Sequence, residues 1–340
     1  MKKTAGILSA FLITLICSCG NSEDSCAKRD LFAMDTYMTI TAYGDNAEAA
    51  LDKACSKITE LEGLFSVTDA NSDICRINSS DGSTIEINSY TSDIISRSKE
   101  LSEITEGAVD ITVYPLVKEW GFTTGNYNVP SEARINELLG FTGTSHIRLS
   151  GSKAYVPDNF LLDLGSVAKG YAGEEAAAIL KEEGVSSAIL SLGGNVQTIG
   201  DKPDGSPWRV AVTSPFSPSD IICTISVRDK AVVTSGNYQR FFVAEDGKKY
   251  CHIIDPETGY PVDNGLASVT VIGESGTYCD GLSTALFVMG EEKAVNFLKE
   301  RQDFDMLIIT NDGRMILTEN IYENIEFSDE SLSQKAEVIK

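Results

Sequence analysis

Two hydrophobic periodicities alternate along the whole chain, and this alternation limits the folds that the sequence can adopt. Residues 32–43 alternate between apolar and polar side chains as a half-buried strand does, whereas residues 46–64 place apolar side chains at helical spacing. No Pro/Gly-rich linker and no internal repeat divides the 340 residues. Helical patterns recur at residues 93–105, 131–139, 167–183, 280–289 and 291–301, and strand patterns recur at 160–164, 188–192, 208–271, 306–310 and 314–317. Strands and helices interspersed in this order predict an α+β fold with mixed, largely antiparallel sheets and packed helices.

The N-terminus has the composition of an export signal. Two lysines precede a short apolar run, residues 5–16, which is too short to span a bilayer comfortably. Ser18 and Cys19 then resemble the end of a lipobox, in which a small residue precedes the cysteine that receives the lipid. We therefore expect a lipoprotein that is anchored through Cys19 at the extracytoplasmic face of the cell membrane. A cleaved signal without a lipid is the alternative.

This interpretation divides the chain into four segments. We expect a lipoprotein signal peptide at residues 1–18, a polar tether at 19–30, one folded body at 31–328 and a polar tail at 329–340.

The charge balance excludes some partners. The chain has 28 basic and 50 acidic residues and a formal net charge of −22. Such a chain repels nucleic acid and anionic membrane surfaces, so neither is expected as the main partner. A substrate that carries phosphate would require a divalent cation, held by carboxylate or hydroxyl oxygens. The eight cysteines contain no CxxC pair, so no zinc site is predicted.

A helical segment near residue 280 carries three oxygen-bearing side chains. If the helix begins near Asp280, then Asp280, Ser283 and Thr284 share one face, because side chains three and four residues apart are neighbours. Hard oxygen ligands suit Mg²⁺, which takes few protein ligands and keeps positions for phosphate oxygens. The alternative is that Asp280 is an N-cap followed by two ordinary small residues.

A second segment has the pattern of an anion site. A predicted strand, residues 160–164, leads through Gly165 and Ser166 into the helix predicted at 167–183. The free N–H groups at the start of a helix attract anions, and Lys169 lies one turn inside. The alternative is a plain strand-to-helix joint with a solvated lysine.

The chain has only two histidines, and His252 stands shortly before the turn-forming sequence DPETG. Pro256 and Gly259 mark a tight turn there. A hairpin with a histidine at the end of its incoming strand is one interpretation, and a functional histidine is the other.

In another segment, Asp110 precedes an apolar, aromatic stretch that could line a binding site for a flat heterocycle.

Taken in order, these segments carry a specific resemblance. The segments are AMDT, SVTDANSDICRIN, GAVDITVYPLVKEWGF, DLGSVAKGY, SLGGNV, VVTSGNYQRFF, HIIDPETGYPV and SVTVI followed by CDGLSTALFVMG. With these segments in this order, the chain closely resembles the ApbE family of FAD:protein FMN transferases from about residue 32 to about residue 309. The resemblance implies an ApbE-like fold that binds FAD with Mg²⁺. It also implies transfer of FMN to a threonine hydroxyl of an acceptor flavoprotein, with release of AMP.

The resemblance also implies roles for individual residues. The family positions that line FAD fall on Met34, Thr68, Ala108, Val109, Asp110, Asp163, Lys169 and Ile254. The positions near the metal fall on Ser166, through its backbone carbonyl, and on Asp280, Ser283 and Thr284. Two positions depart from the pattern: Asp35 stands where glycine is usual, and Thr68 stands where an aromatic side chain often stacks on FAD.

In this interpretation His252 faces the scissile pyrophosphate or the incoming hydroxyl. A histidine titrates near neutrality and can take the threonine proton, while Asp255 orients it or shares that role. Two alternatives remain open: an FAD pyrophosphatase that releases FMN and AMP, and a non-catalytic FAD-binding lipoprotein. By family analogy, the acceptor is a subunit of a membrane redox complex of the Rnf or sodium-pumping NADH:quinone reductase type.

Overall fold

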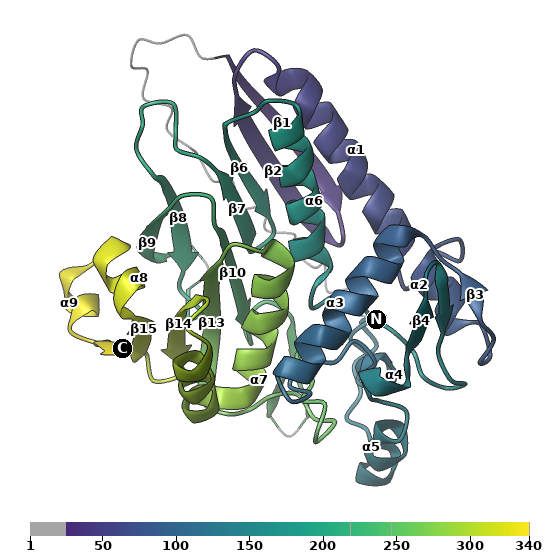
Figure 1. Ribbon diagram of the computed structural model, residues 1–340. Coiled ribbons are helices and arrows are strands. Elements are labelled where there is room, and N and C mark those ends of the chain that lie inside the picture. Colours follow the sequence, from purple (N-terminus) through teal and green to yellow (C-terminus); the bar gives the residue numbers. More distant parts are fainter. Residues whose placement is uncertain (1–24, 218, 246, 340) are drawn as a thin grey trace, which may run out of the picture.

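The computed structural model describes residues 25–217, 219–245 and 247–339. Its centre is a nine-stranded sheet (Figure 1). In spatial order the strands are β1 (Cys26–Ala33), β2 (Thr36–Tyr43), β6 (Ser187–Leu192), β7 (Asn195–Ile199), β10 (Ala231–Gly236), β13 (Leu266–Gly273), β14 (Asp305–Thr310), β15 (Met315–Thr318) and β17 (Ala336–Ile339). Neighbouring strands are antiparallel except β15 and β17, which are parallel.

Helices cover one face of this sheet. Helices α1 (Ala47–Phe65), α6 (Ala168–Glu182) and α7 (Gly276–Arg301) pack on the strands, and α3 (Ser89–Ile104) packs against α7 (Figure 1). The main hydrophobic core lies between the helices and the sheet. Its fully buried side chains include Met38, Leu51, Ile58, Leu190 and Phe287. The predicted α+β class with largely antiparallel sheets is confirmed.

A second, smaller sheet covers the opposite face. It consists of β8 (Trp208–Thr213), β9 (Ile221–Val227) and β16 (Ile325–Phe327), and α8 (Glu319–Asn324) packs beside it. Trp208 and Ile225 of this sheet share a core with side chains of β13 and β14. The central sheet is therefore buried on both faces.

A third core lies apart from the other two, at the end of the molecule that carries α4 (Tyr114–Glu119) and α5 (Glu132–Leu139) (Figure 1). These helices pack against the two-stranded sheet of β11 (Phe241–Val243) and β12 (Lys249–Cys251). Its buried members are Leu116, Trp120, Phe122, Ile135, Leu138, Tyr250 and Ile254. We call this group the aromatic core.

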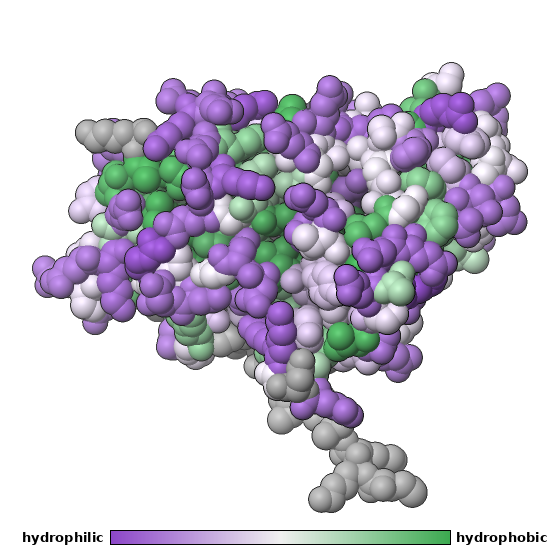
Figure 2. Space-filling view, turned by 90° about the horizontal axis from the view of Figure 1, so that it is seen from below, coloured by the Kyte–Doolittle hydropathy of each residue, from purple (hydrophilic) through white to green (hydrophobic). Residues whose placement is uncertain are grey.

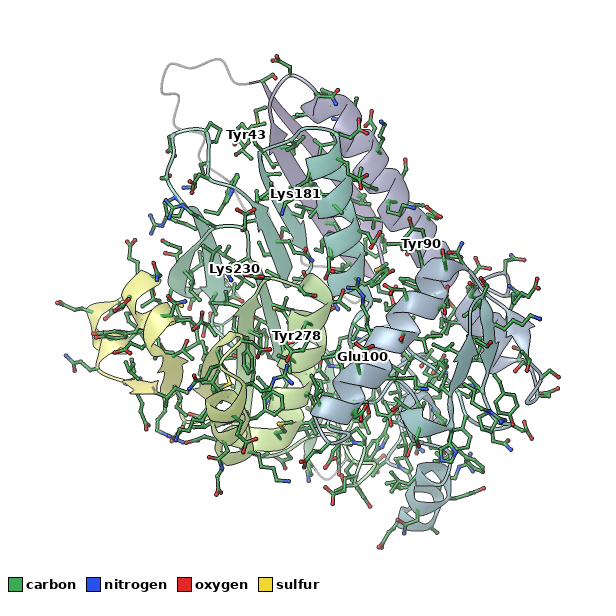
Figure 3. The ribbon with its side chains drawn as sticks, viewed as in Figure 1. Tyr43, Tyr90, Glu100, Lys181, Lys230 and Tyr278 are labelled. Atoms are coloured by element: carbon green, nitrogen blue, oxygen red, sulfur yellow. The ribbon has the colours of Figure 1, made fainter. Side chains whose placement is uncertain are left out.

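The remaining elements are short. They are α2 (Asp73–Asn78), a sheet of β3 (Ile85–Glu86), β5 (Lys153–Tyr155) and β4 (Arg148–Ser150), a 3₁₀ turn (Thr144–His146) and α9 (Glu330–Ser333). Tyr90 lies in the first turn of α3 (Figure 3), and Lys57 of α1 lies 4.2 Å from its ring centroid, which joins the two helices.

Several predicted boundaries are wrong. The strand predicted at residues 32–43 is the hairpin of β1 and β2, whose turn residues Met34 and Asp35 have φ of 51° and 58°. The tether predicted at 19–30 cannot extend that far, because β1 begins at Cys26. The polar tail at 329–340 contains α9 and β17, and β17 completes the central sheet beside β15. No strand forms at 160–164, where Leu161 makes only an isolated bridge to Val113.

Other predictions agree with the structure. The two helical patterns at 280–289 and 291–301 are the two halves of α7, which are separated by Gly290 with φ of 78°. Ser131 caps α5 as predicted, because its side chain accepts a hydrogen bond from the Arg134 N–H. None of the cysteines between residues 25 and 339 forms a disulfide in the described chain.

The surface is mainly polar on the face that Figure 2 shows. The face seen from below is mostly hydrophilic, and its apolar side chains form separate small patches (Figure 2). Within the described residues, no helix combines the length and the apolar character that a membrane span requires. The predicted signal peptide and Cys19 lie outside the described residues.

Candidate active site

The site is organised around the contact of α6 with α7. The two helices approach so closely at Gly170 and Gly276 that a Cβ on Gly170 would lie 2.2 Å from the carbonyl oxygen of Gly276. Only glycine fits this contact. It allows the backbone N–H of Gly170 to donate a hydrogen bond to Oδ2 of Asp280, at 2.8 Å. The start of α6 and the first turns of α7 are thereby joined.

Asp280 is not an N-cap, contrary to the alternative above. The helix begins four residues earlier, where the Ser275 side chain accepts a hydrogen bond from the Tyr278 N–H. Asp280 is 4% exposed, and no cationic side chain of the described chain lies within ion-pair distance of it. Burial raises the pKa of its carboxyl, and the Lys169 charge and the Asn195 amide oppose that rise. A buried carboxylate without a paired cation is unfavourable unless a ligand compensates its charge.

Hydroxyl groups gather beside Asp280, as the helical spacing predicted. The Ser283 Oγ donates to the Asp280 carbonyl at 2.9 Å, and the Thr284 Oγ1 lies 3.5 Å from the same oxygen. Ser235 of β10 completes the group, since its Oγ lies 2.8 Å from Ser283 Oγ and 3.3 Å from Thr284 Oγ1. Three hydroxyls from α7 and β10 therefore lie together beside the Asp280 backbone.

Ser166 lies two residues before α6, so its carbonyl is outside the helix. Gly170 is the third residue of α6, and its N–H belongs to the first turn, which has no acceptor within the helix. That N–H donates to Asp280 instead. The described residues contain no cluster of three or more His, Cys, Asp or Glu side chains with metal-binding geometry. Any cation here would therefore be held by one carboxylate together with neutral oxygens.

Lys169 and Asp163 lie next to this group. Lys169 Nζ lies 3.5 Å from the Gly165 carbonyl, and its charge lowers the pKa of Asp163, Asp280 and His252. Asp163 accepts a hydrogen bond from the Gly165 N–H at 2.7 Å, and burial raises its pKa overall. The predicted anion site, the predicted metal group and the predicted histidine therefore share one region.

Ala108, Val109 and Asp110 lie in a loop beside Asp163, because the Asp163 N–H donates to the Ile111 carbonyl at 2.8 Å. Val109 is buried and Ala108 is half-buried. The Asp110 carboxylate accepts the N–H and the hydroxyl of Thr112, and burial raises its pKa. The Asp110 carboxylate therefore stabilises this loop through hydrogen bonds.

Met34 and Thr68 both lie at the C-terminal end of α1. The Met34 N–H, in the β1–β2 turn, donates to Oε1 of Glu62 at 2.7 Å. Thr68 is exposed, and its N–H donates to Ser66 Oγ. Ile254, by contrast, belongs to the aromatic core and is 5% exposed.

His252 directly follows β12. Its Nδ1 lies 3.2 Å from the Arg240 carbonyl, and its backbone N–H donates to the same oxygen at 3.0 Å. A carbonyl can only accept, so Nδ1 carries the proton and Nε2 keeps its lone pair. The ring is half-buried and lies 6.5 Å from the Phe122 ring. Burial, together with the charges of Arg240 and Lys169, lowers the pKa of His252 to about 4. This pKa is lower than the near-neutral value expected of a histidine.

Asp255 does not orient His252, contrary to prediction. Its two carboxylate oxygens accept hydrogen bonds from the Glu257 N–H and the Thr258 hydroxyl, each at 2.9 Å. The carboxylate therefore stabilises its own turn, as aspartate commonly does at this position of a turn.

Sequence reasoning missed three residues that the fold brings to the site. Ser235 and Arg240 lie on the segment VVTSGNYQRFF, which is part of the family resemblance but for which no site residue is predicted. Glu174 was not singled out, although it lies one turn after Gly170 on α6. Its carboxylate accepts hydrogen bonds from Ser275 and Thr277 at the start of α7 and from Arg97 of α3.

Comparison with known proteins identifies the family of the chain. The family model described as "ApbE family" matches residues 34–308. An FAD:protein FMN transferase of Klebsiella pneumoniae is 33% identical over 80% of this chain and 85% of its own length, and that of Escherichia coli K12 is 31% identical over 82% and 83%.

Solved structures agree as well. The ApbE protein of Thermotoga maritima matches with a TM-score of 0.82 and 33% identity, over 90% of this chain and all of that one. The flavin transferase ApbE of Vibrio cholerae matches with a TM-score of 0.79 and 28% identity, over 88% and 99%. With the family model covering most of its length, the chain belongs to the ApbE family.

Proposed function

We propose that this chain transfers FMN from FAD to a threonine hydroxyl of an acceptor protein and releases AMP. FMN transfer from FAD to a protein is the activity for which its relatives are named, and they align with most of this chain. The observation that carries the proposal is that Lys169, in the first turn of α6, acts both on Asp280 at the α6–α7 contact and on His252. Such a transfer needs an anion site, charge compensation and a proton acceptor together.

The residues present fit Mg²⁺. The ion prefers one or two carboxylates and otherwise takes water and phosphate oxygens. Asp280 would supply the carboxylate, and Ser283, Thr284 and the Ser166 carbonyl would supply neutral oxygens. The carboxylate is buried without a paired cation, as expected of a ligand. When bound, Mg²⁺ would neutralise charge on the pyrophosphate, which a chain of net charge −22 otherwise repels.

The chain's own residues account for the remaining requirements. Lys169 and the first turn of α6 would bind the phosphates. The threonine oxygen bonds to the phosphorus of the FMN half, and the bond from that phosphorus to the AMP oxygen breaks. His252 Nε2 accepts the threonine proton, while the Arg240 carbonyl holds Nδ1. Bound phosphates would offset the charges of Arg240 and Lys169, so the pKa of His252 rises toward its ordinary range in the complex.

FAD would lie against the residues that surround this contact. Ala108, Val109 and Asp110 adjoin Asp163 through the Asp163–Ile111 hydrogen bond, which supports their assignment to one binding surface. Met34 and Thr68, at the end of α1, and Ile254, in the aromatic core, complete the proposed FAD-binding set.

A purified-protein assay tests the proposal. FAD, Mg²⁺ and a candidate acceptor are mixed, and the acceptor is examined for flavin fluorescence in a denaturing gel. Covalent fluorescence with equimolar AMP is the expected result. Free FMN with AMP and an unlabelled acceptor would indicate a pyrophosphatase, and unchanged FAD would indicate a binding protein.

We further propose where the chain is located in the cell and which kind of protein accepts the FMN. Cys19 would carry the lipid that holds the chain at the extracytoplasmic face of the membrane, as the Ser18-Cys19 pattern indicates. The acceptor would be a subunit of a membrane redox complex of the Rnf or sodium-pumping NADH:quinone reductase type. Labelled fatty acid should be incorporated into the wild type and not into Cys19→Ala. Equal labelling of both proteins would reject the anchor.

A further inference from the structure

Arg240 forms no ion pair with any carboxylate of the described residues. The chain has 50 acidic residues for 28 basic ones, and the arginines that the structure describes form ion pairs, with two exceptions. One exception is Arg148, which stacks 4.0 Å from the centre of the Tyr155 ring. The other is Arg240, which has no described carboxylate within 4.0 Å. Arg240 is exposed, so its guanidinium is accessible to a ligand from solvent.

The backbone and the side chain of Arg240 are both held in place. The Arg240 carbonyl accepts the two hydrogen bonds from His252, and the guanidinium Nη2 donates to the Phe122 carbonyl at 2.7 Å. Phe122 is 2% exposed in the aromatic core, so this anchor is rigid. Only one of the five N–H donors of the guanidinium is used in this contact.

The charge of Arg240 acts on the same region as that of Lys169. Burial is the largest influence on both groups, raising the pKa of Asp163 and lowering that of His252, and the charges of Arg240 and Lys169 act to lower both pKa values. Arg240 follows Ser235, the β10 residue in the hydroxyl group, by five positions. It therefore lies on the segment that joins the proposed metal site to His252.

We propose that Arg240 binds phosphate oxygens of FAD and, together with Lys169, holds the pyrophosphate beside His252. This assignment rests on the proposed function for the identity of the ligand. A guanidinium presents paired donors that match two phosphate oxygens, and it stays charged at any working pH. Arg240 would thus be a substrate-binding residue, and its carbonyl would orient the histidine.

Flavin binding without acceptor tests the assignment separately from transfer. The affinity for FAD and for riboflavin, which lacks phosphate, is measured by flavin fluorescence with wild type, Arg240→Gln and Arg240→Lys. Loss of a charged hydrogen bond should weaken FAD binding by roughly 10- to 100-fold in Arg240→Gln and leave riboflavin binding unchanged. Arg240→Lys keeps the charge and should recover part of the affinity. Arg148→Gln, which removes the other arginine without an ion pair, should bind FAD as the wild type does.

A second measurement excludes a purely structural role. In Arg240→Gln the acid limb of kcat/KM should move to higher pH, because the charge that depresses the pKa of His252 is removed. Equal losses of FAD and riboflavin binding, or unchanged FAD binding, would overturn the assignment. An acid limb that stays in place would overturn it too. If Arg240→Gln weakens the binding of FAD but not of riboflavin, and the wild type nevertheless transfers no FMN, the proposed function is rejected and the assignment of Arg240 stands.

Discussion

Asp280 and Asp255 were both predicted to lie in the site, and their surroundings are opposite. Asp280 lies buried at the α6–α7 contact, where the Gly170 N–H donates to its carboxylate, the Asn195 amide and the Lys169 charge act on it, and no cationic side chain of the described residues forms an ion pair with it. Asp255 lies in a half-exposed turn, and both of its carboxylate oxygens accept hydrogen bonds from that turn.

The difference shows what distinguishes a functional carboxylate from a structural one. Asp255 is satisfied by its own neighbours, so its turn is complete without a ligand. Asp280 is held by packing in a place where its charge is uncompensated, so a ligand would stabilise it. Position within a recognisable motif does not reveal this difference, whereas hydrogen bonds and burial do.

The largest effect is expected for Asp280→Asn. The amide oxygen can still accept from Gly170, but the charge that would bind Mg²⁺ is removed. FMN transfer should fall on the order of 10³-fold at ordinary Mg²⁺ concentration and recover partly at much higher concentration. The melting temperature without metal should not decrease, because burial already disfavours the charged form. Transfer as a function of Mg²⁺ concentration, with melting curves, provides the measurement. Superimposable Mg²⁺ curves would contradict the assignment.

His252→Ala should have the next largest effect, because it removes the proton acceptor. Turnover should fall by roughly 10²–10⁴-fold, while FAD affinity stays close to normal. Single-turnover transfer and fluorescence titration separate the two quantities. A parallel loss of FAD affinity would make His252 a binding residue instead.

The pH dependence follows from the same histidine. The base acts when it is unprotonated, so a pKa lowered to about 4 keeps it active well below neutrality in the free protein. The acid limb of kcat/KM for FAD should therefore lie near pH 4 instead of near 6.5. The acid limb of the pH profile of kcat should lie at higher pH, because phosphates bound in the complex raise the pKa of His252. Rate measurements from pH 4 to 8 test this order, and coincident limbs would refute it.

A smaller effect is expected for Glu174→Ala, which loosens the helix contact that positions Asp280. Burial acts to raise the pKa of Glu174, but hydrogen bonds from Ser275, Arg97 and Thr277 outweigh it and lower the pKa. Losing these bonds should decrease the free energy of unfolding by roughly 2–3 kcal/mol, as measured by denaturant titration. Glu175→Ala, at the neighbouring position, serves as the control and should cost less. Equal losses in both variants would show that Glu174 has no special role.

The smallest effect is expected for Asp255→Asn. The turn keeps one acceptor and loses a charge, so the free energy of unfolding should decrease by about 1 kcal/mol or less. The Mg²⁺ dependence of transfer should match that of the wild type. A changed Mg²⁺ dependence would remove the distinction between the two aspartates.

Much of the fold was predictable, because it rests on local patterns. The helical repeats around Leu51 and Ile58 and the grouping of Asp280 with Ser283 follow from periodicity alone. The turn at Met34 and Asp35 was missed because both residues adopt positive φ, which ordinary residues avoid and which no glycine marked.

The rest of the site depends on contacts between distant segments. Ser235 reaches Ser283 across 48 positions, and Glu174 caps a helix that begins about one hundred residues later. The pKa of His252 depends on Arg240 and Lys169, which lie on different elements. No spacing in the sequence reports such contacts, because the packing of α6 on α7 creates them.

The most direct test of the account is to locate the metal. Crystals grown with FAD and with Mn²⁺ in place of Mg²⁺ would give an anomalous difference map. We expect a peak roughly 2.0–2.3 Å from a carboxylate oxygen of Asp280, beside Ser283, Thr284 and the Ser166 carbonyl. A map with no peak at Asp280, or with its peak at the Asp255 turn, would contradict it.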